Sequence, residues 1–341
     1  MNSTIIKCVA GSGKTTEAIG FMQKNKNGLY LAFNNKIVDE VSRKGYLSKT
    51  IDSLFQSFII PKLIGLVPLI GEGKKISYVI TSDLTGYLKG IGNIKIDKDG
   101  KIYNCTKFTG ICLDDSNFSV HNRETFPNSS LIKYIFGQNE LRLTDEHRKE
   151  LSEFLIRKYP NQIVNLLFSR FYYIIIDEAQ DLKNYQEKFV ELLHDSKLIT
   201  FISGDDNQNI NGGGDWFAKL QADEIRNKSY RCPDTNCKWI RENLNIDING
   251  NENLTEIKII DKADVINYDD GDRVLLYNAC SGKFKEIIEK WQGEKLTIKK
   301  AKGLTIEKDV VIVGTSLNDK NLYTAITRTT KNVFSTVKCQ K

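Results

Sequence analysis

A glycine-rich segment near the start of the chain constrains the fold more than any other stretch. Residues 8–15 read CVAGSGKT, and they follow the apolar pair Ile5-Ile6 and precede a helical pattern over residues 16–22. A buried strand that turns through glycines into a helix N-terminus points several free backbone N–H groups at one place, where a phosphate can bind. The alternative is an ordinary glycine turn before a helix, and the strand–turn–helix context favours the phosphate loop.

The phosphate loop predicts roles for particular side chains. Lys14 would reach the terminal phosphates of a nucleoside triphosphate, and the Thr15 hydroxyl would ligate Mg²⁺. Cys8 stands where Gly or Ala is commonest, and a side chain of that size is tolerable there. The residues expected around the nucleotide in this segment are Ala10, Gly11, Ser12, Gly13, Lys14, Thr15 and Thr16.

Composition is that of a folded protein from a reducing compartment. The 341 residues suffice for roughly two domains, and a hydrophobic fraction of 40% excludes a disordered chain. Seven cysteines, an odd number with one in the phosphate loop, do not form a disulfide framework. The net charge of +6 permits a nucleic-acid partner without demanding one.

We expect no membrane segment, because the longest apolar runs fall far below the roughly 18 residues of a membrane span. The N-terminus enters a core strand directly and leaves no room for a signal peptide. The expected location is therefore intracellular and cytoplasmic. The Lys-, Asn- and Ile-rich composition with five Pro suggests an AT-rich genome, such as that of a virus or phage. For a viral or phage protein, the expected location would be the cytoplasm of the host cell.

Strands and helices alternate along most of the chain, which predicts an α/β fold with parallel sheets flanked by helices. The pattern changes over residues 56–160, where strands at 75–80 and 94–102, the latter with a two-residue hairpin turn, indicate an inserted subdomain. Elsewhere we expect strands at residues 28–34, 198–204, 272–279, 309–315 and 333–337, the last closing a sheet, and helices at residues 36–41, 237–244 and 284–291.

The second informative stretch is residues 172–181, which read YYIIIDEAQD. Its apolar residues predict a central strand, whose carboxyl end is where open α/β sheets bind ligands. Asp177 would hold Mg²⁺, usually through water, and Glu178 would orient and deprotonate an attacking water. The alternative is that both carboxylates cap a helix; together with a phosphate loop, catalysis is favoured.

AGSGKT followed by DEAQD resembles superfamily 1 helicases, and the UvrD/Rep type in particular. Four later segments are similar to further motifs of that family: GDDNQNI at 204–210, NKSYR at 227–231, TIKKAKGL at 297–304 and YTAITR at 323–328. The resemblance makes Gln208 a sensor of the γ-phosphate and Tyr230 the residue that stacks on the base. It makes Arg231 a contact of the γ-phosphate, Gly303 a nucleotide contact and Arg328 an arginine finger.

The resemblance also implies a fold and a domain organisation. Two RecA-like parallel-sheet domains would form a P-loop NTPase motor, with the small insertion in the first. The expected boundaries are residues 1–220 for the first domain, with its insertion at about 56–160, and residues 221–341 for the second. Arg231 and Arg328 lie in the second domain, so ATP would act as a clamp that closes the two domains and hydrolysis would release it.

Contacts with a nucleic-acid strand are expected from the same resemblance. In the first domain it places them at Phe33, Asn34, Thr50 and Ser53. Trp216 is a candidate for stacking on a base, with core packing as the alternative. Lys299 stands where the family commonly has His and would touch a backbone phosphate, or would simply be solvated.

The chain departs from the family pattern in three places. Seven residues precede Cys8, so the upstream segment that recognises adenine is missing and other purine triphosphates should be accepted. Thr305 replaces a Glu that would contact the ribose. About fifty residues separate Asn245 from Lys295, too few for the large second insertion of the UvrD type.

The expected function is an ATP-dependent helicase or translocase that moves along single-stranded DNA, 3′ to 5′, and unwinds duplex. Its cofactors would be ATP and Mg²⁺, its partners single-stranded DNA and replication or repair proteins, and its state a monomer. Two alternatives stay open, a single-strand translocase or remodeler that does not unwind and an RNA-directed helicase. A regulatory binding module with a vestigial ATP site is disfavoured by the intact motifs.

Overall fold

The computed structural model describes residues 3–66, 75–78, 95–96, 102–104, 106–108, 111–113, 118–120, 140–143, 145–278, 282–314 and 317–337. It divides into two compact units. Unit 1 comprises Lys49–Phe171 and Asn184–Leu198, and unit 2 comprises Asn2–Ser48, Tyr172–Lys183 and Ile199–Lys341. Apart from residues 49–50 at one edge of the first sheet, both large sheets belong to unit 2. The predicted domain boundary near residue 220 therefore does not separate these units, and it stays a prediction.

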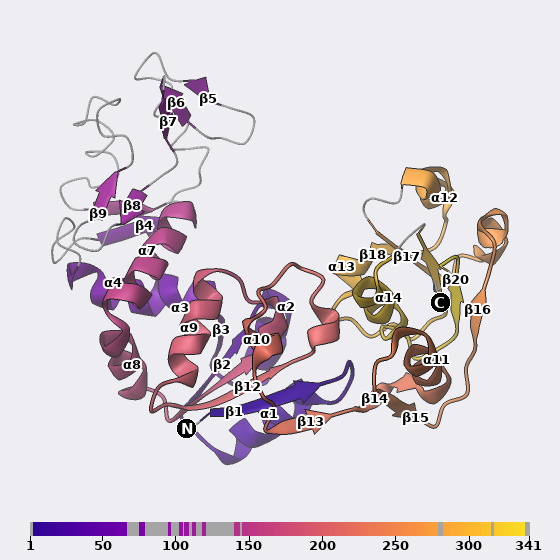
Figure 1. Ribbon diagram of the computed structural model, residues 1–341, viewed down its shortest axis with the longest axis horizontal. Coiled ribbons are helices and arrows are strands. Elements are labelled where there is room, and N and C mark those ends of the chain that lie inside the picture. Colours follow the sequence, from indigo (N-terminus) through magenta and orange to yellow (C-terminus); the bar gives the residue numbers. More distant parts are fainter. Residues whose placement is uncertain are drawn as a thin grey trace. The chain divides into compact units, whose positions relative to one another are not determined.

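The first large sheet has six strands in the order β13-β1-β12-β11-β2-β3 (Figure 1). The strands are β1 (Ser3–Cys8), β2 (Gly28–Ala32), β3 (Ser48–Thr50), β11 (Tyr173–Asp177), β12 (Ile199–Gly204) and β13 (Glu224–Arg226). The neighbours from β13 to β2 pair in parallel. Every residue of β2 and β11 is buried, as expected for the continuous apolar runs of a parallel sheet covered on both faces.

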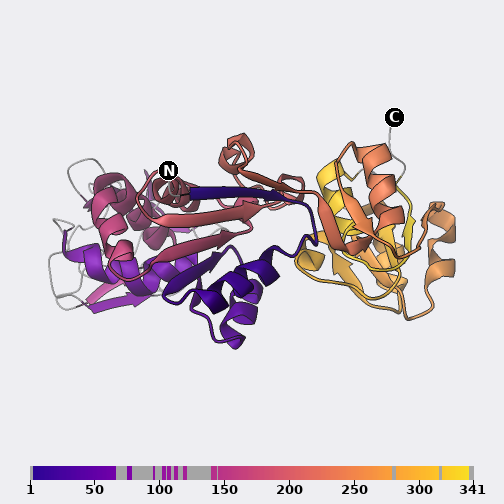
Figure 2. The same cartoon turned by 90° about the horizontal axis from the view of Figure 1, so that it is seen from below.

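Two helices cover one face of this sheet, α1 (Lys14–Lys24) and α2 (Asn35–Arg43), and Figure 2 shows them together on that side. Ile19 and Met22 of α1 and Val41 of α2 pack with Tyr30 and Tyr173 in one apolar cluster. The helix α2 begins after Asn34, whose side chain accepts a hydrogen bond from the backbone N–H of Ile37 at 3.1 Å. That bond satisfies one of the free N–H groups of the first turn.

The second large sheet has five parallel strands in the order β16-β20-β19-β17-β18. They are β16 (Ile257–Ile259), β17 (Val274–Tyr277), β18 (Lys295–Thr297), β19 (Val310–Val313) and β20 (Val333–Ser335). Along β17, Val274 and Leu276 join one apolar cluster and Leu275 joins the other, because successive side chains of a strand point to opposite faces. The prediction that residues 333–337 close the sheet is wrong: β20 lies inside, and β16, which the sequence pattern did not reveal, forms the edge.

The remaining elements of unit 2 connect the strands of the two sheets. Next to the first sheet are η3 (Ala179–Asp181), η4 (Asp206–Gln208) and α10 (Trp216–Lys219). The others are β14 (Lys228–Pro233), α11 (Asp234–Leu244), β15 (Asn249–Asn251), η5 (Lys262–Tyr268), η6 (Gly282–Phe284), α12 (Lys285–Lys290), α13 (Ile298–Ala301) and α14 (Asp319–Ile326). The α/β prediction is thus confirmed, with two parallel sheets as expected for tandem RecA-like domains.

Unit 1 is larger than the predicted insertion and includes the helix that follows the DEAQD segment. Its helical elements are α3 (Ile51–Leu54), η1 (Phe55–Ile59), α4 (Ile60–Leu63), η2 (Ile64–Leu66), α7 (Asp145–Lys158), α8 (Pro160–Phe168) and α9 (Tyr185–His194). Buried Arg148 of α7 binds the Asp52 carboxylate at 3.2 Å and the Tyr185 hydroxyl at 2.8 Å, which joins three segments distant in sequence.

Short strands make up the rest of the described part of unit 1. They are β4 (Lys75–Tyr78), β5 (Lys95–Ile96), β6 (Ile102–Asn104), β7 (Thr106–Phe108), β8 (Ile111–Leu113), β9 (Phe118–Val120) and β10 (Glu140–Leu143). The predicted hairpin is confirmed as an antiparallel pairing of β5 and β6, while its turn lies outside the described residues. Among the described residues, no helix has the length and apolarity needed to cross a membrane.

Candidate active site

The phosphate loop lies between β1 and α1 and is shaped by two glycines with positive φ. Gly11 has φ +73° and Gly13 has φ +84°, in the left-handed region that favours glycine. A Cβ on Gly11 would lie 2.7 Å from Ser229 Oγ and 2.8 Å from Arg231 Cβ. The backbone of β14 therefore approaches the loop closely, and the strand that carries Tyr230 and Arg231 leaves no space for a side chain at position 11.

Asp177, at the carboxyl end of β11, accepts four hydrogen bonds. Its Oδ2 accepts from the Thr15 hydroxyl at 3.0 Å and from the Tyr30 hydroxyl at 2.6 Å. Its Oδ1 accepts from the backbone N–H of Glu178 at 2.9 Å and from the Ser203 hydroxyl at 3.1 Å. The two predicted Mg²⁺ residues, Thr15 and Asp177, thus lie in direct contact, and the carboxylate has a fixed orientation.

Glu178 adopts a left-handed backbone conformation with φ +59°, which is uncommon for a residue with a side chain. Gln180 donates a hydrogen bond to its carboxylate at 2.5 Å. Burial opposes ionisation of Glu178, but Lys14 and Lys302 outweigh burial and lower the pKa of this carboxyl. In return, Glu178 and Asp177 outweigh the burial of Lys14 and raise the pKa of its ammonium. At neutral pH the site therefore holds an ionised carboxylate and a charged lysine.

A buried hydrogen-bond chain links the phosphate loop to the two motifs beyond it. Tyr323 of α14 accepts from the backbone N–H of Ala10 at 2.9 Å and donates to Asp205 Oδ2 at 2.9 Å. Gln208 donates to the same Asp205 oxygen at 2.6 Å, and its Oε1 accepts from Arg328 at 2.9 Å. The predicted γ-phosphate sensor and the predicted arginine finger are therefore in contact, although they follow strands of different sheets.

Arg328 is buried and Arg231 is half-buried, and neither side chain forms an ion pair in the described part of the chain. Burial, followed by repulsion from Arg231, lowers the pKa of Arg328 to about 9. Burial also lowers the pKa of Arg231, whose Nε finds no hydrogen-bond partner in the described part of the chain. Arg231 Nη1 reaches the Leu304 carbonyl at 3.4 Å and the Thr305 hydroxyl at 3.3 Å. Arg328 is hydrogen-bonded to Gln208 and to neighbouring oxygens, whereas the unpaired Nε of Arg231 leaves a donor that fits an anion such as the γ-phosphate of a nucleotide.

Lys302, beside the predicted contact Gly303, forms a buried ion pair that the sequence did not reveal. Its ammonium lies 2.6 Å from Asp181 Oδ2 and 2.6 Å from the carbonyl of Gln208. Gly303 has φ +83°, so this turn needs glycine. The turn after α13 is thereby tied to the DEAQD segment and to the predicted sensor.

The predicted base-stacking residue lies at the edge of a cavity beside the phosphate loop. The cavity has a volume of about 730 Å³, and its walls include Ser12, Gly13, Thr16, Asn227 and Tyr230. The Tyr230 side chain is 67% exposed, and its ring lies 3.6 Å from where a Cβ on Gly13 would be. An exposed aromatic ring over the phosphate loop offers a stacking surface for a nucleobase.

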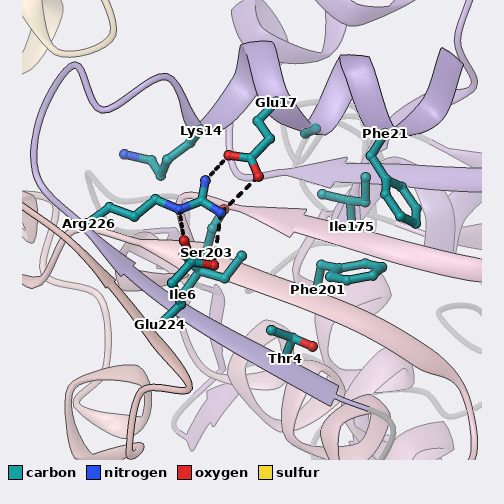
Figure 3. A pocket seen from close by; sticks show the side chains of 11 residues that line it. Thr4, Ile6, Lys14, Glu17, Phe21, Ile175, Phe201, Ser203, Glu224 and Arg226 are labelled. Carbon is teal, nitrogen blue, oxygen red and sulfur yellow. Dashed lines mark hydrogen bonds and ion pairs between the residues drawn. The ribbon is translucent and has the colours of Figure 1, made fainter. Parts of the chain in front are cut away.

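A second cavity of about 170 Å³ lies between α1 and the sheet (Figure 3). Phe21 and Phe201 form an aromatic wall, with ring centroids 4.8 Å apart. Arg226, on β13, binds Glu17 of α1 at 2.9 Å and Glu224 at 2.6 Å, and all three side chains line this cavity and the larger one. These ion pairs tie the phosphate-loop helix to the strand that leads to Tyr230.

The residues predicted to contact a nucleic-acid strand are spread over several elements. Asn34 and Thr50 each cap a helix through their side chains, and Thr50 accepts from the backbone N–H of Ser53 at 3.1 Å. Phe33 is half-buried after β2 and Lys299 is exposed on α13. Trp216 is half-buried, whereas the neighbouring Phe217 is 1% exposed and fills the core. Stacking and core packing both remain predictions for Trp216.

Besides Lys302, sequence reasoning missed three hydrogen-bonding residues of this site. Tyr30, Tyr323 and Asp205 are buried beside the predicted residues and hydrogen-bond to them or to each other. Tyr323 and Asp205 lie inside segments recognised as motifs, so their position was a usable signal. Tyr30 sits in an apolar strand run, and nothing in that pattern distinguishes it from a core residue.

Comparison with known proteins identifies one family and several distant relatives. The family described as UvrD/REP helicase N-terminal domain matches residues 119–212, which include the DEAQD segment and the Gln208 motif. Gabija protein GajB of Bacillus cereus (strain HuB5-5) is 25% identical over 284 residues, covering 76% of this chain and 37% of that protein. The chain thus spans little more than a third of the length of this curated relative.

Solved structures of viral helicases also resemble the chain at low identity. Arterivirus nonstructural protein 10 (helicase) matches with a TM-score of 0.47 and 12% identity, covering 98% of this chain and 59% of that one. Its complex with DNA matches with a TM-score of 0.48 and 13% identity, covering 99% and 62%. The family to which this chain is similar is therefore the UvrD/REP helicase N-terminal domain, over residues 119–212.

Proposed function

We propose that this protein is an ATP-hydrolysing motor that moves along nucleic acid. The observation that carries the proposal is the contact between Arg328 and Gln208, 2.9 Å apart. It lies near half-buried Glu178, whose carboxyl pKa is lowered by Lys14 and also by Arg328. Phosphoryl transfer is catalysed by positioning and by cations that neutralise charge on the γ-phosphate. Groups from both sheets contribute to this contact, so nucleotide binding and release would act on both.

Each side chain has a role in the proposed hydrolysis. Lys14 binds the terminal phosphates, and Glu178, ionised at neutral pH, orients the attacking water and accepts its proton. Arg231 and Arg328 stabilise the charge that develops on the γ-phosphate. Thr15 and Asp177 would hold Mg²⁺, which neutralises phosphate charge when bound. The Thr15 hydroxyl and the Asp177 carboxylate supply oxygen ligands, which Mg²⁺ prefers, and Thr15 Oγ1 lies 3.0 Å from Asp177 Oδ2.

The test is steady-state ATP hydrolysis with and without single-stranded DNA or RNA, in wild type and in Lys14→Ala. Lys24→Ala is a matched control, because Lys24 lies on the same helix and is exposed. We expect stimulation by one polymer, loss of turnover in Lys14→Ala and no change in Lys24→Ala. Turnover that no polymer stimulates would contradict the motor, and turnover that survives Lys14→Ala would contradict the site.

We propose single-stranded DNA as the track and 3′ to 5′ as the direction. The support is the DEAQD resemblance together with the mildly basic charge of +6. Partial duplexes with a 3′ or a 5′ single-stranded tail test the direction, and tails of RNA test the track. We expect strand displacement only from substrates with a 3′ single-stranded tail. Displacement from substrates with a 5′ tail would contradict the proposed direction.

A translocase that does not unwind is the second candidate, and the short connection between α11 and β18 favours it. Those residues, 245–294, hold β15, β16, η5, β17, η6 and α12 and leave no space for a large insertion. A protein-displacement assay on single strands separates the candidates. Displacement of a bound protein without duplex unwinding supports the translocase, and unwinding of duplex supports the helicase.

We also propose that the nucleotide site accepts GTP as well as ATP. The support is that Tyr230 offers its ring to the base, and stacking discriminates poorly between purines. Comparable turnover of ATP and GTP is expected, and strict use of ATP would contradict this assignment.

A further inference from the structure

Tyr30 is a fully buried tyrosine whose hydroxyl faces the predicted Mg²⁺ site. It lies on β2, paired in register with Ile175 of β11, and its side chain is 0% exposed. The hydroxyl donates to Asp177 Oδ2 at 2.6 Å, the shortest of the four hydrogen bonds that this carboxylate accepts. A buried hydroxyl needs a partner, and here the partner is a carboxylate with a proposed function.

The position of the Tyr30 hydroxyl is fixed by its surroundings. The ring packs in the apolar cluster between the sheet and its helices, with Ile19 and Met22 of α1. Thr15 donates to the same carboxylate oxygen, but it belongs to the helix that carries the phosphate loop. Tyr30 belongs to an interior strand of the sheet instead, so its hydroxyl is held by a different element from the one that carries the loop.

The carboxylate also transmits its orientation to the neighbouring catalytic residue. Asp177 Oδ1 accepts the backbone N–H of Glu178, whose φ is +59°. A rotation of the Asp177 side chain would therefore disturb the contact that supports this backbone conformation. Hydrogen bonds behind a metal-binding carboxylate commonly hold it in the orientation that the metal needs.

We propose that Tyr30 is a positioning residue, which holds the Asp177 carboxylate oriented toward Mg²⁺ and toward the Thr15 hydroxyl. This inference rests on the proposed function. The Tyr30→Phe variant tests it, because it removes the hydroxyl and keeps the ring in the core. Tyr173→Phe is the matched control: this buried tyrosine lies on the adjacent strand, and its hydroxyl donates to the carbonyl of Asn25 at 2.8 Å.

The experiment measures binding of a fluorescent ADP analogue as Mg²⁺ is titrated, and again in EDTA. For Tyr30→Phe we expect the Mg²⁺ concentration at half-saturation to rise about tenfold, the lower end of the effect of losing such a contact. Binding in EDTA should be unchanged. Tyr173→Phe should match wild type in both. Unlike turnover, these readouts separate orientation of the carboxylate from damage to the fold.

The outcomes are distinguishable. An unchanged Mg²⁺ dependence in Tyr30→Phe, or an equal shift in Tyr173→Phe, would overturn the positioning role. Weaker binding of the analogue in EDTA would also overturn it, because that result indicates a structural role. Failure of the wild type to bind nucleotide at any Mg²⁺ concentration would instead contradict the proposed function itself.

A second, independent inference concerns the 170 Å³ cavity under α1 (Figure 3). We infer that it binds a small neutral aromatic molecule that carries an N–H or O–H donor. An apolar cavity of about 150 Å³ in another protein holds benzene, and here Phe21 and Phe201 supply an aromatic wall. At the rim, Glu17 and Glu224 share one guanidinium, so their carboxylates can accept a further hydrogen bond.

Indole and benzene are the probes, and their binding is followed by ligand-observed NMR. Ala18→Leu fills the cavity from α1, and Gln23→Leu adds the same side chain at an exposed position of that helix. In wild type and in Gln23→Leu, we expect indole to bind more tightly than benzene. In Ala18→Leu, we expect no binding of indole. No binding of indole at millimolar concentration, or binding that survives Ala18→Leu, would overturn the site.

Discussion

Replacing Lys302 with methionine should strongly destabilise unit 2, because the change leaves a buried carboxylate without its cation. Lys302 Nζ lies 2.7 Å and 2.6 Å from the two Asp181 oxygens, and the side chains are 8% and 1% exposed. Burial already outweighs the lysine and raises the pKa of Asp181. Removing one partner of such a pair costs about 3–5 kcal/mol of unfolding free energy. Methionine keeps most of the apolar part of the lysine side chain, so the loss of unfolding free energy measures the effect of removing the charge.

The Lys302→Met/Asp181→Leu double variant is the matched control. Replacing both members of a buried ion pair by apolar residues is often nearly neutral, so the double variant should recover most of the loss. In the single variant the pKa of Asp181 rises further, and the folded protein binds a proton that the unfolded chain does not. Its unfolding free energy therefore falls as pH rises, and the deficit should be larger at pH 8 than at pH 5.

The assay is urea unfolding of wild type, both single variants and the double variant, followed by the fluorescence of the three tryptophans at both pH values. A loss of less than about 1 kcal/mol in Lys302→Met at pH 8 would refute the reasoning, since a buried unpaired charge must cost more. A deficit that grows as pH falls would refute it as well. A double variant less stable than Lys302→Met would show that packing, not charge, dominates here.

Three further predictions concern Arg328, Glu178 and Cys8. Arg328→Gln should lower kcat by about 10³-fold and leave binding of a nucleoside diphosphate unchanged, because the lost contact is to the γ-phosphate; a drop below tenfold would contradict this. The lowered pKa of Glu178 places the acid limb of the kcat–pH profile below the ordinary carboxyl range, and a limb near neutrality would contradict the assignment. Burial raises the pKa of the Cys8 thiol to about 11, so alkylation at pH 8, followed by mass spectrometry, should be about a hundredfold slower than for a free cysteine; equal rates would contradict burial.

Much of the fold, and the proximity of several candidate site residues, could be predicted from local sequence. Buried parallel strands are continuous apolar runs, so β11 was recognised together with Asp177 at its end. The glycines of the phosphate loop indicate a left-handed backbone, because glycine adopts positive φ without a steric cost, and Gly11 and Gly13 have positive φ. Both signals arise from a few adjacent residues, and the structure brings those residues together.

Contacts between distant segments could not be predicted in this way. Tyr30 and Asp177 are 147 residues apart, and Lys302 and Asp181 are 121 apart. Neither pair leaves a periodic signal, because a tyrosine in an apolar strand and a lysine before a glycine are ordinary locally. The edge strand β16 has one half-buried and two exposed residues and no long apolar run, so its place in the sheet depends on pairing with β20.

Unit 1 is discontinuous in the chain, and this has a consequence for anyone who would isolate unit 2. The chain leaves unit 2 after Ser48 and returns at Tyr172 for twelve residues that include Asp177 and Glu178. It then leaves again after Lys183 and returns at Ile199. Removing unit 1 therefore requires two new junctions, one joining Ser48 to Tyr172 and one joining Lys183 to Ile199. Both junctions border the twelve-residue segment that carries Asp177 and Glu178.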